Sequence, residues 1–286
     1  MDARLLPSPR SASRLAMTLP TPLALLDLVV PKDAGSRRIA AGLAYGPHAR
    51  HRLDLYAPKQ AAGPLPVLLF VYGGGWDSGR RQEYAFAGRA FAALGFLTAV
   101  ADYRIVPEVQ FPAFVEDAAL ATNWLLEHAE GHGGDPQRVA FAGHSAGAYI
   151  AVTLALQPAR FGAPDLSGRL AGVVGLAGPY DFYPFDVKQS IRAFEGIAEP
   201  ERSQPINLVT PAAPPMFLGH GDKDTTVGPY HTVRLAKKLR EAGVAVVERQ
   251  YPTLAHAGPL LNLMRPFRGG TTLYADVSAF LAGLPR

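Results

Sequence analysis

Short apolar runs recur along the chain and are separated by amphipathic stretches. Continuous apolar runs predict strands that are buried on both faces, at residues 67–72, 96–101, 139–142, 170–177 and 216–218. Polar and apolar residues alternate over 52–56, which is typical of a half-buried strand, and Pro58 ends it. A last strand is predicted at 244–251, where Pro252 ends it.

The segments between these strands have the period of helices. Apolar residues recur at three- and four-residue steps, which predicts helices at 86–94, 112–130, 146–156, 230–242 and 271–281. Gly131 and Gly243 are typical stop signals for two of them. Strands that alternate with helices indicate the α/β class, with a mostly parallel, doubly wound sheet and helices on both faces.

Two segments depart from this alternation. Residues 178–214 interrupt the order, and we expect them to form a small cap-like insertion over the site in a single domain of residues 18–286. Residues 1–17 are rich in Arg and Ser and predict a disordered or extra N-terminal tail. The apolar run 19–30 is too short to span a bilayer and fits a signal peptide poorly, because Asp27 interrupts it. We therefore expect no stable membrane insertion and a cytoplasmic location, with secretion left open.

Composition narrows the classes of function. The 286 residues carry a net charge of +4, but eight Lys/Arg against three Asp/Glu lie in the first 52 residues, and the rest is nearly neutral. Because no basic stripe follows the predicted elements, we expect no nucleic-acid partner. The chain has no cysteine, which excludes disulfides, thiolate metal sites and a cysteine nucleophile.

The pentapeptide Gly143-His144-Ser145-Ala146-Gly147 carries the strongest chemical signal. It follows a predicted strand and opens a predicted helix. A strand-to-helix reversal this sharp strains the central residue, requires small neighbours and projects the serine hydroxyl above the sheet. The helix N-terminus behind it stabilises developing negative charge. We therefore expect Ser145 to be a nucleophile.

A nucleophilic serine needs a base and an acid that orients the base. Beyond the loop that follows strand 216–218, His231 falls inside a predicted helix, where we expect a surface residue. His256 follows the last strand and is the expected base. In the loop itself, Asp222 and Asp224 both qualify by position as the acid, and spacing slightly favours Asp224.

Acyl transfer also needs donors for the oxyanion. Tyr72-Gly73-Gly74-Gly75-Trp76 follows the first central strand, and consecutive glycines let backbone N–H groups approach a substrate oxygen. We expect the N–H groups of Gly73, Gly74 and Ala146 to form the hole. No phosphate-binding loop with a Gly-Lys-Ser/Thr ending is present.

At this point the residues resemble the α/β-hydrolase superfamily, in particular its esterase and lipase-like branch with an H-G-G-G-W motif. That branch includes hormone-sensitive-lipase-type and prenylcysteine-methylesterase-like carboxylesterases. The resemblance extends from about residue 40 to the C-terminus and includes Asp102-Tyr103-Arg104, Gly134-Asp135-Pro136 and His220-Gly221-x-x-Asp224. It implies an α/β-hydrolase fold, and it implies that Asp224 is the acid of the triad. In one departure, Tyr72 replaces the histidine that usually precedes the glycines and helps to brace the oxyanion loop.

The resemblance and the residues together predict a serine carboxylesterase that hydrolyses neutral esters through an acyl-enzyme. The insertion at 178–214 is aromatic, and we expect its residues Tyr180, Phe182 and Tyr183 to line the substrate pocket. We expect Trp76, at the end of the glycine run, to line it as well. We expect no metal and no other cofactor, because Gly131 breaks the helical spacing of His128 and His132. Two alternatives stay open: an amidase, formamidase or aminopeptidase-like hydrolase with the same triad, and a non-catalytic binding protein of the same fold.

Overall fold

The computed structural model describes residues 21–285, so the N-terminal tail predicted at 1–17 lies outside the described residues. Eight strands form one sheet in the order β1-β2-β4-β3-β5-β6-β7-β8. The strands are β1 (Ser36–Ala44), β2 (Arg52–Pro58), β3 (Leu65–Val71), β4 (Leu97–Ala101), β5 (Gly134–His144), β6 (Leu170–Leu176), β7 (Met216–Gly221) and β8 (Val246–Tyr251). β2 is antiparallel to both β1 and β4, and the six strands β3 to β8 are parallel to one another. The mostly parallel sheet predicted from the apolar runs is confirmed.

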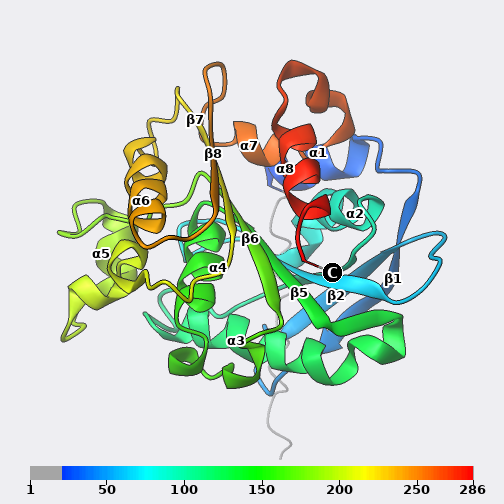
Figure 1. Cartoon of the computed structure of the whole chain (residues 1–286), viewed down its shortest axis with the longest axis horizontal. Helices are drawn as coiled ribbons and strands as arrows, with labels where there is room; N and C mark the ends of the chain where they lie inside the picture. Colours follow the sequence, from blue (N-terminus) through cyan, green and yellow to red (C-terminus); the bar gives the residue numbers. More distant parts are fainter. Residues whose placement is uncertain (1–20, 286) are drawn as a thin grey trace, which may run out of the picture.

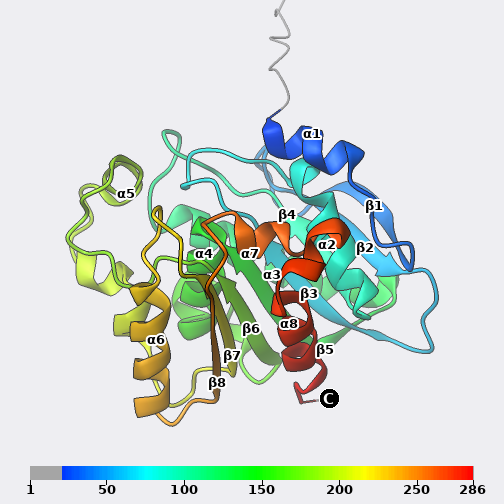
Figure 2. The same cartoon turned by 90° about the horizontal axis from the view of Figure 1, so that it is seen from above.

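Helices cover both faces of the sheet (Figures 1 and 2). On one face lie α1 (Pro22–Val29), α2 (Ala85–Ala93) and α8 (Leu273–Ala282), and on the other lie α3 (Ala113–His128), α4 (Ala146–Leu156) and α6 (Tyr230–Glu241). All eleven residues of α4 are buried, because the sheet, the neighbouring helix α3 and the 3₁₀ turn Pro205–Leu208 all pack against this helix. α4 is therefore a rigid base for the residue that precedes it.

The order of the strands reverses at β3. The chain passes from β3 to β4 on one side of it, and then crosses to β5 on the other side. Loops that leave the carboxyl ends of strands at such a switch point diverge and leave a crevice between them. The loops after β3 and β5 contain the glycine run and Ser145, which brings these two sequence motifs together.

The segment predicted as a cap contains α5 (Lys188–Phe194) and two short 3₁₀ turns, Pro200–Ser203 and Pro205–Leu208. The second turn rests on α4 and α6, and α5 stands at the outer end of this layer (Figure 2). Backbone hydrogen bonding ties α5 to the main body, since Phe111 N–H donates to the carbonyl of Ala193 at 2.9 Å. A short helix, α7 (Gly258–Leu261), follows β8.

Candidate active site

Ser145 occupies the sharp turn between β5 and α4. Its φ of 55° and ψ of −125° lie in a strained region for a residue with a side chain. The flanking glycines are needed for close packing, because a Cβ at Gly147 would lie 2.1 Å from the carbonyl oxygen of Val71. A Cβ at Gly143 would lie 2.4 Å from the carbonyl oxygen of Gly147. The backbone geometry thus accounts for the spacing of the pentapeptide.

Three side chains from distant parts of the sequence form one chain of hydrogen bonds. Ser145 Oγ lies 2.9 Å from His256 Nε2, and His256 Nδ1 lies 2.7 Å from Asp224 Oδ2. Nδ1 donates to the carboxylate, so Nε2 is free to accept the serine proton. The structure therefore brings together the three residues that the sequence predicted as nucleophile, base and acid.

The competing aspartate lies elsewhere. Asp222 is exposed on the same loop, whereas the side chain of Asp224 is completely buried. The other oxygen of Asp224, Oδ1, accepts from the backbone N–H groups of Thr226 and Val227, each at 2.9 Å. Burial opposes ionisation of Asp224, but the hydrogen bonds from His220 and His256 outweigh it and hold the pKa of this carboxyl well below its usual value. Asp224 is therefore a permanent anion beside His256.

The glycine loop lies directly against the serine. A Cβ at Gly73 would stand 2.9 Å from both the carbonyl oxygen of His144 and the Cβ of Ser145. Between residues 21 and 285, the N–H groups of Gly73, Gly74 and Ala146 donate to no protein acceptor. Unpaired donors on two loops beside Ser145 are the arrangement that an oxyanion requires.

Tyr72 braces this loop, at the position where the resemblance leads us to expect a histidine. Its hydroxyl donates to Asp102 Oδ1 at 2.8 Å and accepts from Arg50 Nη2 at 3.0 Å. The ring stacks between those of Tyr84 and Tyr103, with centroids 4.8 and 4.9 Å away. The sequence left the hydrogen bonding of this loop open, and the structure supplies it through the tyrosine hydroxyl.

His144, inside the pentapeptide, is a functional candidate that sequence reasoning missed. Its Nε2 donates to the backbone carbonyl of His256 at 2.9 Å, which fixes the loop that carries the base. Burial, followed by the neighbouring His256, lowers the pKa of His144 to about 3. The ring is therefore neutral at physiological pH. Its position next to Ser145 was visible in the sequence, but its contact with a loop 112 residues away was not.

The prediction that His231 is a surface residue is wrong. Its side chain is buried, and Nδ1 accepts from the backbone N–H of Asp181 at 3.1 Å. Burial, followed by the neighbouring His220, lowers its pKa to about 4. This histidine thus holds the start of the cap onto α6. His128, by contrast, is exposed and stacks on Trp124, as expected of a histidine at a helix end.

The four aromatic residues predicted as pocket walls occupy different environments. Tyr180 is fully buried, with its hydroxyl packed against Gly175 and Gly178 below the cap, so the prediction that it faces substrate is wrong. The Trp76 ring is nearly buried and packs against those of Phe182 and Phe194 at centroid distances of 5.9 and 5.1 Å. Tyr183 is exposed. Trp76, Phe182 and Tyr183 remain predicted substrate contacts.

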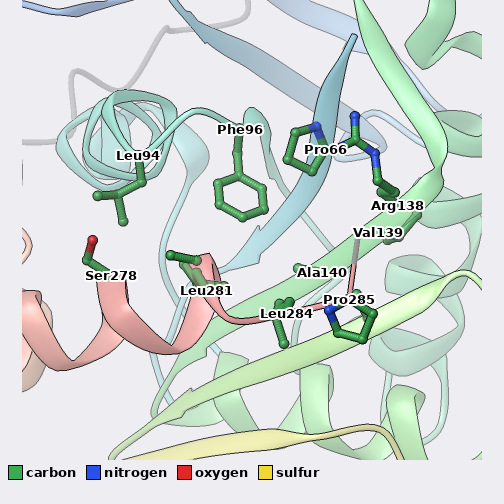
Figure 3. A pocket seen from close by; sticks show the side chains of 12 residues that line it. Pro66, Leu94, Phe96, Arg138, Val139, Ala140, Ser278, Leu281, Leu284 and Pro285 are labelled. Atoms are coloured by element: carbon green, nitrogen blue, oxygen red, sulfur yellow. The ribbon is translucent and has the colours of Figure 1, made fainter.

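A cavity of about 250 Å³ lies at the amino-terminal ends of the parallel strands (Figure 3). Its lining includes Pro66 and Val139, which lie near the starts of β3 and the paired part of β5, and Leu281 from α8. The catalytic candidates lie instead at the carboxyl ends of the strands. Among the described residues, no group of three or more His, Asp or Glu is placed to hold a metal ion, and no helix is long and apolar enough to cross a bilayer.

Comparison with known proteins identifies the family. The model of the BD-FAE family matches residues 53–239, about two-thirds of the chain. The chain belongs to the BD-FAE family. Within the α/β hydrolases it groups with esterases. It is similar to the probable isoprenylcysteine alpha-carbonyl methylesterase ICMEL1 of Oryza sativa subsp. japonica, with 31% identity over 82% of this chain and 60% of that protein. It is 32% identical to esterase LipQ of Mycobacterium tuberculosis over 80% of this chain and 60% of that one.

This BD-FAE family member thus spans about three-fifths of the length of these curated relatives. Among solved structures, the fold is similar to that of the thermophilic carboxylesterase EstE1, cloned from a metagenomic library. The TM-score is 0.76 at 22% identity, over 92% of this chain and 94% of that one. The α/β-hydrolase fold predicted from the sequence is confirmed.

Proposed function

We propose that this BD-FAE family member is a serine carboxylesterase that hydrolyses neutral carboxylic esters through an acyl-enzyme intermediate. The observation that carries the proposal is the hydrogen-bonded chain from Ser145 through His256 to Asp224. The unpaired N–H groups beside the serine support it, and so do relatives whose names describe them as esterases.

Acylation begins when Ser145 Oγ attacks the ester carbonyl carbon and His256 Nε2 takes the hydroxyl proton. The carbonyl oxygen becomes an oxyanion, which the N–H groups of Gly73, Gly74 and Ala146 stabilise. Collapse of this intermediate breaks the bond to the alcohol oxygen, and His256 gives that oxygen the proton. Asp224 stabilises the imidazolium throughout, because its carboxylate stays ionised and hydrogen-bonded to Nδ1.

Deacylation repeats these steps with water as the nucleophile. His256 removes a proton from water, hydroxide adds to the acyl carbon, and Ser145 leaves with the proton returned by His256. The products are one carboxylic acid and one alcohol for each ester consumed. Neutral substrates fit the near-neutral charge of residues 53–286 and the aromatic surroundings of Trp76.

The test compares the purified wild-type protein with its Ser145→Ala variant on a short p-nitrophenyl ester. We expect the variant to fold and its turnover to fall by at least about three orders of magnitude. A wild-type protein that hydrolyses aminoacyl-anilides faster than esters would favour the amidase alternative. Failure of the wild type to react with a fluorophosphonate would favour the non-catalytic one.

A further inference from the structure

A second buried histidine touches the carboxylate of the proposed triad. His220, at the end of β7, lies with Nε2 3.0 Å from Asp224 Oδ2, the same oxygen that accepts from His256. Both side chains of this pair are completely buried. The three-residue chemistry assigned above does not use this contact, which leaves its role open.

The neighbours of His220 determine where its proton sits. Nε2 lies near two acceptors, Asp224 Oδ2 and the carbonyl of Val227, the latter at 2.9 Å. Two acceptors require a donor between them, so Nε2 carries hydrogen. Nδ1 lies 2.8 Å from Thr232 Oγ1 on α6, and the threonine hydroxyl can donate to it. Thr232 thereby favours the tautomer that carries its hydrogen on Nε2.

With His220 included, Asp224 has four donors. Two backbone N–H groups bind Oδ1, and two imidazole N–H groups bind Oδ2. A carboxylate offers about four lone-pair sites, so this one is saturated and cannot rotate. The N–H of His220 also takes up part of the negative charge on the oxygen that faces His256.

We propose that His220 is a positioning residue, which orients the Asp224 carboxylate and weakens its pull on the proton of the catalytic base. The inference rests on the proposed esterase function. Without this N–H, Asp224 would stabilise imidazolium at position 256 more strongly. The base would then stay protonated up to a higher pH, and the acidic limb of the kcat/KM profile would move with it.

Other charged or titratable groups near this pair do not produce the same effect. His144 on β5 and His231 on α6 face the cluster, but burial lowers the pKa of His144 to about 3 and that of His231 to about 4. Asp181 in the cap is paired with Arg234 on α6 at 2.7 Å. Both of these histidines are therefore neutral between pH 5 and 9.

The experiment measures pH profiles of kcat/KM for His220→Phe and His220→Gln. Phenylalanine removes the donor while keeping the ring shape, and glutamine can place an N–H near the position of Nε2. We expect the acidic midpoint to rise by about half to one pH unit in the phenylalanine variant. We expect it to return toward the wild-type value in the glutamine variant.

A matched control is His51→Gln, because His51 is also a buried histidine next to a buried aspartate, Asp117, at 3.0 Å, but it lies outside the site. We expect its acidic midpoint to be unchanged. An unshifted midpoint in a folded, active His220→Phe variant would overturn the inference while leaving the esterase proposal intact. Absence of Ser145-dependent ester hydrolysis from the wild-type protein would instead refute the esterase proposal.

A measurement on the wild type covers the case in which the phenylalanine variant does not fold. Imidazole ¹⁵N NMR should show that the ring hydrogen of His220 lies on Nε2, as the contacts of its two nitrogens require. An Nδ1–H tautomer would contradict the proposed role.

Discussion

The hydroxyl of Tyr72 donates to Asp102 at 2.8 Å and so ties the oxyanion loop to the end of β4. Asp102 also accepts from the backbone N–H of Arg81 at 2.6 Å and from its guanidinium. The glycine loop therefore begins at a fixed point in a buried ion network. Tyr72 thus does the bracing that the resemblance would assign to a histidine at this position.

Tyr72→Phe removes this tie while keeping the stacked ring. We expect it to lower stability by about 1–3 kcal/mol, because Asp102 loses a buried donor, and to lower kcat/KM several-fold. Tyr84→Phe is the matched control, since within residues 21–285 the Tyr84 hydroxyl makes no hydrogen bond although its ring stacks on Tyr72. Urea unfolding and ester kinetics measure both effects, and equal losses in the two variants would contradict a bracing role.

Gly73→Ala tests the contact between the glycine loop and the serine. The added methyl would lie 2.9 Å from Ser145 Cβ, so the loop must move and its N–H donors move with it. We expect kcat to fall by about 100-fold, the loss typical of one oxyanion donor. Gly131→Ala serves as the control, because nothing lies within 4 Å of a Cβ there. Comparable activity in the two alanine variants would show that Gly73 does not hold the oxyanion.

The buried histidines predict that stability depends on pH. The pKa values of His144 and His231, lowered to about 3 and about 4, lie below the ordinary 6.5. Between pH 6.5 and 4 the unfolded chain thus binds more protons than the folded one, and the free energy of unfolding drops as pH falls. Each histidine should contribute at most about 1.4 kcal/mol to this drop in the free energy of unfolding for each pH unit. The Asp224 carboxyl lowers the free energy of unfolding further only when the pH falls below 3.8, its ordinary pKa.

His231→Asn separates the contribution of one histidine, because the amide oxygen can accept from Asp181 in place of Nδ1 but does not titrate. Urea unfolding at pH 7.5, 6.0 and 5.0 should give a shallower pH dependence in the variant. Identical slopes would mean that the pKa of His231 is the same in the folded and unfolded chains, which would contradict this account.

The cap depends on Phe194 for its attachment. This fully buried ring lies 5.1 Å from that of Trp76 and 5.7 Å from that of Phe114 on the main body. Phe194→Ala should destabilise the protein by about 3–5 kcal/mol. Tyr183→Ala, in the same segment but exposed, should change stability by less than about 0.5 kcal/mol. Thermal unfolding of both variants checks this, and a small effect at Phe194 would mean that the cluster does not anchor the cap.

Much of the fold followed from the sequence, because central parallel strands must be continuously apolar. The edge strand β1 was missed because most of its residues are exposed or half-buried, which leaves no clean alternation. The burial of His231 had a signal that was not used. It lies four and eight residues before Leu235 and Leu239, on the buried face of α6.

Ser145 and His256 followed from motif order and loop position, and the choice of Asp224 over Asp222 followed from the family resemblance. The roles of the residues around the triad did not follow from the sequence. His220 touches Asp224 only because β7 turns sharply after it, and His144 reaches His256 only because two loops meet at the switch point. Such contacts depend on tertiary packing, which periodicity does not encode. Tyr180 was misplaced for the same reason, since its aromatic character fits a pocket wall and a core residue equally well.

The central claim is that Ser145 carries the acyl group during turnover. Acid quenching of the protein while it hydrolyses p-nitrophenyl acetate, followed by peptide mapping, tests it most directly. The account predicts acetylation at Ser145 that disappears once the substrate is consumed and is absent from Ser145→Ala. Steady hydrolysis without an adduct on Ser145, or with the acetyl group on another residue, would contradict it.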